Sequence, residues 1–105
     1  ALVELGFWDR LQPKLVFGQD VRATLAFVES GNVDAALVYA TDAMAAATVE
    51  ALDIVPADSY PRIVYPVALV KGARQKDGAS DFLDFLRGPE ALQTFAEYGF
   101  EPAQQ

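Results

Sequence analysis

The start of one helix offers the first group in this chain that could do chemistry. Asp20 stands at an N-cap position, and the apolar residues after it predict a helix from about Val21 to Ser30. As a cap, the Asp20 carboxylate accepts a bond from the N–H of Arg22 or Ala23, which leaves the N–H of Val21 without a partner. The helix dipole adds partial positive charge at the same end, so the predicted chemistry is binding of an anion. Every helix start offers such groups, so this feature alone does not define a site.

A tyrosine provides a second candidate donor. Tyr39 ends the apolar run 35–39, which predicts a buried strand just before a turn at Thr41 and Asp42. In α/β sheets ligands collect at the carboxyl ends of strands, so the hydroxyl of Tyr39 is expected near the start of helix 21–30. A core tyrosine whose hydroxyl bonds a backbone carbonyl is the alternative, and the residues alone favour it.

The elements that would position these groups follow from periodicity and turn residues. A strand, a helix and a strand come in order around the two candidates, which is typical of an α/β fold. Pro66 lies inside the longest predicted strand, where it indicates an edge or a bend. Gly88 and Pro89 end one helix and begin another. The predicted strands are 14–17, 35–39, 49–55 and 62–71, and the predicted helices include 21–30, 43–47, 79–86 and one that follows Gly88.

Composition excludes most kinds of catalytic and metal site. The chain has 105 residues, which suffices for one modest core, and it contains neither Cys nor His. Disulfides, thiolate metal sites, cysteine nucleophiles and histidine bases are therefore excluded. No apolar run approaches the ~18 residues that a membrane-spanning helix needs.

The net charge of −7, with scattered Lys and Arg, argues against a nucleic-acid partner. It is compatible with anion binding if oriented N–H and O–H groups act at short range in a desolvated cleft, because exposed carboxylates are screened within ~8 Å at physiological salt.

Three blocks of the sequence resemble the second half of the periplasmic molybdate-binding proteins of ABC importers, which are type II periplasmic binding proteins. They agree in order and spacing and cover nearly all 105 residues. The blocks are GFWDRLQPKLVFGQDVRATLAFVESGNVDAALVYATDA, PADSYPRIVYPVALVKG and FLDFLRGPEALQTFAEYGF.

The resemblance implies an α/β fold of the type II periplasmic-binding-protein architecture, truncated to the second half of lobe two and the return into lobe one. Residues 1–105 would be a fragment of a two-lobe solute-binding protein. About 1–61 would belong to lobe two, about 62–72 would form the strand that crosses between lobes, and about 73–105 would form the carboxyl-terminal helices.

The resemblance also implies which residues hold the ligand. In that family neutral donors hold a tetrahedral oxyanion, and two of the donor positions fall on the backbone N–H of Val21 and the hydroxyl of Tyr39. The other donors, two serines of lobe one and a further backbone group, would lie upstream of this chain. Half of the site is therefore expected outside these 105 residues.

The function implied is that of a solute receptor that binds molybdate or tungstate and presents it to an ABC permease, without catalysis. No cofactor is expected, and no metal beyond the molybdate ligand. The expected partners are the permease and either the missing amino-terminal half or a second copy of the chain, and the expected location is the periplasm.

Two alternatives remain open at the level of sequence. The same bilobed fold senses oxyanions as the effector domain of transcription regulators, which an upstream helix-turn-helix would reveal. An enzyme acting on an oxyanion ester is disfavoured, because the chain offers no activated nucleophile.

Overall fold

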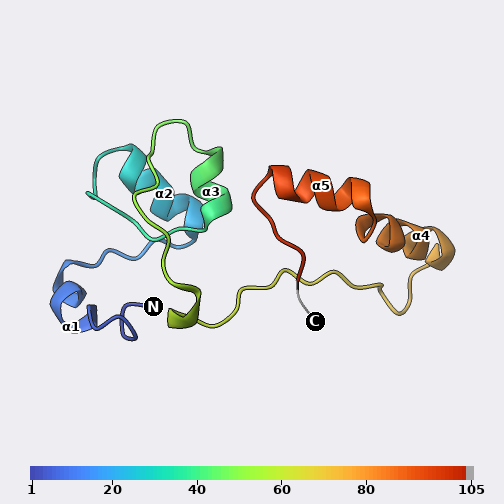
Figure 1. Ribbon diagram of the computed structural model, residues 1–105, viewed down its shortest axis with the longest axis horizontal. Coiled ribbons are helices and arrows are strands. Elements are labelled where there is room, and N and C mark those ends of the chain that lie inside the picture. Colours follow the sequence, from blue (N-terminus) through green and yellow to red (C-terminus); the bar gives the residue numbers. More distant parts are fainter. Residues whose placement is uncertain (104–105) are drawn as a thin grey trace. The chain divides into compact units, whose positions relative to one another are not determined.

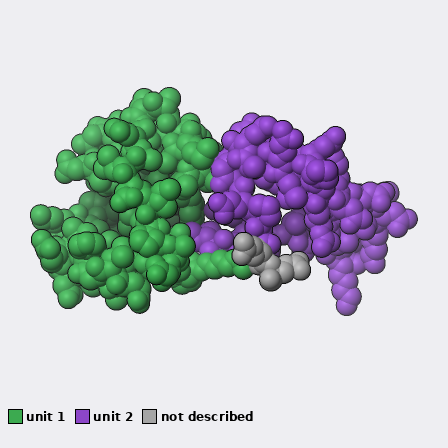
Figure 2. Space-filling model, in the orientation of Figure 1, with its two compact units in different colours: residues 1–62 green, residues 63–105 purple. Residues whose placement is uncertain are grey.

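The computed structural model describes residues 1–103 as helices joined by irregular segments (Figure 1). The chain divides into two compact units, Ala1–Arg62 and the part that begins at Ile63, which Figure 2 colours separately. Unit 1 contains α1 (Trp8–Leu11), η1 (Gln12–Lys14), α2 (Val21–Glu29), α3 (Ala40–Ala45) and η2 (Ala57–Ser59). Unit 2 contains α4 (Lys76–Leu86) and α5 (Pro89–Glu97).

The predicted helix 21–30 is confirmed as α2, and local signals explain both of its ends. Asp20 is extended (φ −152°, ψ 179°), and its Oδ1 accepts a hydrogen bond of 2.7 Å from the N–H of Ala23. At the other end Gly31 has a φ of 75°, a conformation that costs glycine little. This lets the N–H of Asn32 reach the carbonyl of Phe27 at 2.9 Å, as in a Schellman motif.

The short helix predicted at 43–47 is present as α3, but it begins three residues earlier, at Ala40. The carbonyl of Tyr39 accepts hydrogen bonds from the N–H groups of Asp42 and Ala43, both at 3.1 Å. Tyr39 is therefore the N-cap residue of a helix. The alanines continue this helix because their helix propensity is high.

Unit 2 is a pair of contacting helices with aromatic side chains around them. The helix predicted at 79–86 is confirmed as α4, which begins earlier, at Lys76. Pro89 occupies the first turn of α5, as expected for a residue without an N–H. The rings of Phe95 and Phe100 lie 6.4 Å apart, and those of Tyr65 and Phe100 lie 5.9 Å apart, both edge to face.

No residue from 1 to 103 is in a β-strand, so the predicted α/β sheet is not confirmed. Lys14, the first residue of the predicted strand 14–17, instead ends η1. The segments 35–39, 49–55 and 62–71 are irregular, although Tyr39 at the end of the first has extended backbone angles. A strand is stabilised by hydrogen bonds to a neighbouring strand, and these segments find none in the part of the chain that the structure describes.

Much apolar surface stays exposed in the described residues. Only Ala91 and Ser59 are buried there, whereas Phe17, Leu52 and Ile54 are 77–81% exposed. Within residues 1–103, no helix combines the length and the apolar character that crossing a membrane requires. Exposed apolar surface of this extent is typical of a surface that another chain segment covers.

Candidate anion-binding site

The first turn of α2 presents two backbone donors rather than one. The cap bond uses the N–H of Ala23, and the N–H of Thr24 donates to the carbonyl of Asp20 at 3.1 Å. Within residues 1–103, the N–H groups of Val21 and Arg22 donate to no acceptor. The sequence predicted the free N–H of Val21 but left Arg22 as an alternative partner of the cap. The structure thus adds Arg22 to the candidate donors.

The backbone at Gly18 lies close against the first turn of α2, which explains why this position is a glycine. A Cβ atom on Gly18 would lie 2.8 Å from the backbone nitrogen of Thr24 and 3.1 Å from the carbonyl oxygen of Asp20, and it would collide with Thr24 Oγ1. That hydroxyl donates to the same Asp20 carbonyl at 3.0 Å. The segment before α2 therefore folds back against the first turn only because Gly18 has no side chain.

We expect Gly18→Ala to destabilise the start of α2 by about 1–3 kcal/mol, the usual cost of forcing a methyl group into filled space. Urea unfolding followed by circular dichroism would measure the loss. Gly78→Ala is the matched control, because nothing lies within 4 Å of a Cβ at that position of α4. There alanine should stabilise by ~0.5–1 kcal/mol. Equal stability of Gly18→Ala and the unchanged chain would contradict the close approach.

A shallow groove of about 290 Å³ lies between α2 and α3 in unit 1, where the two helices are in contact (Figure 1). Its lining includes Arg22 from the first turn of α2 and Asp42 from the first turn of α3. The first turns of both helices therefore border one groove. The remaining lining residues are Leu25, Glu29, Ala45 and Ala46.

The second candidate, Tyr39, lies at the start of α3 and is 38% exposed. The prediction put it at the end of a strand, whereas the structure makes it a helix cap whose carbonyl holds the first turn. The two predicted ligand residues thus lie at the amino-terminal ends of two helices that contact each other.

The chemistry available at this place is hydrogen bonding by neutral donors. Two N–H groups at one helix start, with the helix dipole behind them, attract an anion without a full positive charge. Residues 1–103 hold no cluster of three or more acidic side chains suited to a metal ion. With no Cys or His, the chain also lacks a thiol nucleophile and an imidazole base.

Comparisons with known proteins agree on one family. Residues 1–101 match the model of the bacterial extracellular solute-binding proteins. Over 100 residues the chain is 42% identical to a putative ABC transporter substrate-binding lipoprotein of Bacillus subtilis and 42% identical to the molybdate-binding protein ModA of Escherichia coli. It is 40% identical to ModA of Haemophilus influenzae.

These matches cover 95% of this chain but only 38–39% of each relative, so the chain spans less than half the length of the proteins it resembles. None of the three is described as a transcription regulator, and the effector-domain alternative is not supported. The resemblance to molybdate-binding proteins seen in the sequence is confirmed. The chain belongs to the family of bacterial extracellular solute-binding proteins.

Proposed function

We propose that this chain is the carboxyl-terminal part of the substrate-binding component of a molybdate ABC importer, a receptor that binds molybdate or tungstate and does no chemistry on it. The observation that carries the proposal is the pair of N–H groups without acceptors at the start of α2, in a chain 40–42% identical to two molybdate-binding proteins.

The donors suit an oxyanion that must be bound and later released. The N–H of Val21, with that of Arg22 beside it, donates to oxygens of the tetrahedral anion, and the hydroxyl of Tyr39 donates from the start of α3. Hydrogen bonds to a charged group are worth ~1.5–3 kcal/mol each, so several are needed for tight binding. Molybdate and tungstate present the same tetrahedral oxygens to these donors.

In the proposed receptor the chain has the type II periplasmic-binding-protein fold. About 1–61 belong to lobe two, about 62–72 cross between lobes, and about 73–105 form the carboxyl-terminal helices. The irregular segments 35–39 and 62–71 form strands when neighbouring strands pair with them. Either the amino-terminal half of the receptor or a second copy of the chain supplies those neighbours. The receptor works in the periplasm and docks on a membrane permease.

Calorimetric titration of the full receptor, in which the amino-terminal half accompanies this chain, tests the function. We expect one saturable site for molybdate and tungstate and no turnover of phosphate or sulfate esters. A receptor that binds none of these oxyanions, or that hydrolyses an ester, would overturn the proposal. The same titration of the Val21→Pro receptor tests the site separately from the function. If the unchanged receptor binds molybdate and the variant binds it equally tightly, the site assignment fails while the function stands.

A further inference from the structure

Arg22 is the only basic residue in a long acidic stretch of unit 1. Residues 15–61 contain seven of the chain's 15 acidic residues and one basic residue, Arg22. An oxyanion that approaches this stretch from solution is therefore repelled by most of the charges it meets. The free N–H groups at the start of α2 do not offset this repulsion, because the field of a helix dipole falls off within the first turn. Among the charged residues of this stretch, Arg22 alone attracts an anion from a distance.

The position of Arg22 places its charge beside the candidate site. Arg22 follows Val21 directly in the first turn of α2, and it also lines the groove between α2 and α3. Glu29 and Asp42 line the same groove. Within residues 1–103, however, the guanidinium of Arg22 forms neither an ion pair nor a hydrogen bond. No direct partner there neutralises its charge, which stays available to an anion at the start of α2.

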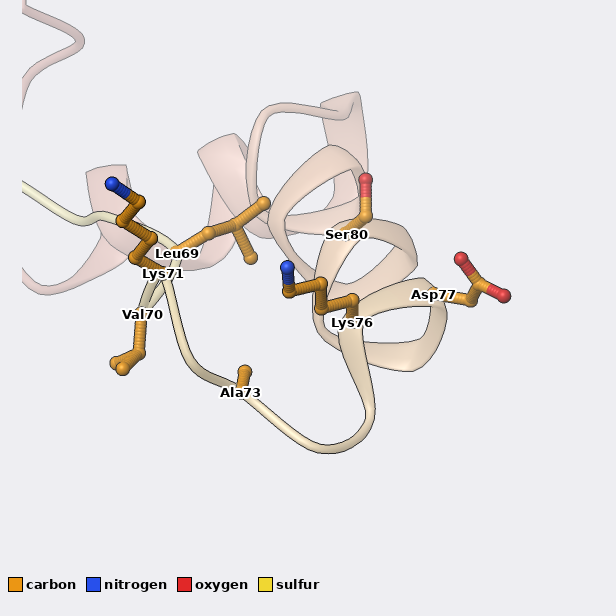
Figure 3. A pocket seen from close by; sticks show the side chains of 7 residues that line it. All are labelled: Leu69, Val70, Lys71, Ala73, Lys76, Asp77 and Ser80. Carbon is orange, nitrogen blue, oxygen red and sulfur yellow. The ribbon is translucent and has the colours of Figure 1, made fainter.

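A lysine of unit 2 has the same local setting as Arg22 but a different place. Lys76 lies in the first turn of α4, where it borders a pocket of about 400 Å³ together with Lys71 (Figure 3). Within residues 1–103 it forms no ion pair. It does not line the groove between α2 and α3. Lys76 is therefore a matched reference for the effect of one unpaired cation at a helix start.

We propose that the side chain of Arg22 is a steering residue, which speeds the capture of the oxyanion without holding it in the bound state. This role rests on the proposed function, because the oxyanion must bind at the start of α2. A unit charge and a dianion roughly 7–10 Å apart in water, screened as at 0.01 M salt, imply about three- to fivefold faster association. At 1 M salt the Debye length is ~3 Å, so the gain should fall below about 1.5-fold.

Stopped-flow measurement of molybdate binding to the full receptor tests this role. Arg22→Gln keeps the backbone N–H and removes the charge, so at 0.01 M salt its association rate constant should be about three- to fivefold lower. Its dissociation rate constant should change by less than about twofold, since a steering charge acts mainly on association. Asp42→Asn removes an acid from the same groove and should raise the association rate constant. Charges in the amino-terminal half are the same in every variant, so the differences report on the groove.

Two controls separate charge from structure. Arg22→Lys keeps the charge and should associate about as fast as the unchanged receptor. Lys76→Gln removes a cation of the same local setting elsewhere and should slow association by less than about twofold. Slow association of Arg22→Lys would assign the effect to the fold, and an equal loss in Lys76→Gln would assign it to net charge. Either result would overturn the steering role.

The rates themselves supply the remaining outcomes. Equal association of Arg22→Gln and the unchanged receptor at 0.01 M salt would overturn the steering role alone, while the proposed function stands. A loss that persists at 1 M salt, or that appears in the dissociation rate constant, would also overturn it, because a direct bond from the guanidinium to the anion would then be present. A full receptor that binds no oxyanion would overturn the proposed function and the steering role with it.

Discussion

Replacing Val21 by proline in the full receptor should weaken molybdate binding by about 10- to 150-fold and leave the fold intact. Proline removes the N–H that we assign to the ligand, and one hydrogen bond to a charged group is worth ~1.5–3 kcal/mol. The helix does not use that N–H, because Val21 is the first residue of α2. Asp20 before it is already extended, as a residue preceding proline must be. In this chain α5 begins in the same way, with Pro89 after an extended Gly88.

Val21→Ala is the control, because alanine keeps the N–H and loses only some packing of a partly exposed side chain. Its affinity should stay close to that of the unchanged receptor. Tyr39→Phe should weaken binding by an intermediate factor, since water can partly replace a hydroxyl. If Val21→Pro melts normally and binds molybdate as tightly as before, the backbone of Val21 is not a ligand.

The isolated 105-residue chain should bind molybdate with millimolar affinity at best. In the proposed site the donors of Val21, Arg22 and Tyr39 lie on one side of the anion only, and the opposite side would stay hydrated. The few bonds of ~1.5–3 kcal/mol must also offset the entropy lost on association, so a dissociation constant near 1 mM, or −4.1 kcal/mol, is the expected limit. Calorimetry on this chain and on the full receptor would measure the difference.

That comparison also locates the remaining donors. A gain of several orders of magnitude in the full receptor is expected if the upstream half completes the site. Submicromolar binding by the 105-residue chain alone would show that the site is built entirely from residues within it, and the half-site interpretation would be wrong.

Local signals allowed the helices to be predicted. Asp20 caps the start of α2 and Gly31 follows its end, so both signals lie next to the helix in the sequence. The bounds of α2 were therefore predicted to within one residue. The pair Gly88 and Pro89 likewise marked the boundary between α4 and α5. Such ends depend on hydrogen bonds between neighbours three to five residues apart, which the sequence itself contains.

The predicted strands show the opposite case. A β-branched run such as 62–71 indicates that a segment can be a strand, but the hydrogen bonds that make it one come from another segment. None of the four predicted segments is paired within residues 1–103. The α/β sheet therefore stays a prediction, and the family of the chain is what supports it.

The candidate site was predicted in part. The free N–H of Val21 followed from the cap at Asp20. Whether the N–H of Arg22 is also free depended on which N–H donates to the Asp20 carboxylate, and the structure shows that this is the N–H of Ala23. Tyr39 was predicted at the end of a strand and just before a short alanine-rich helix. The strand stays a prediction, whereas the helix is present and begins at Ala40, directly after Tyr39, rather than at residue 43.

The most direct test of the oxyanion site observes the amide of Val21 itself. In the full receptor with ¹⁵N-labelled valine, molybdate should shift the Val21 amide resonance in a saturable way, with the dissociation constant found by calorimetry. The proton should move downfield, as it does when an N–H begins to donate to an anion. A Val21 amide that stays unshifted at saturating molybdate would contradict the account.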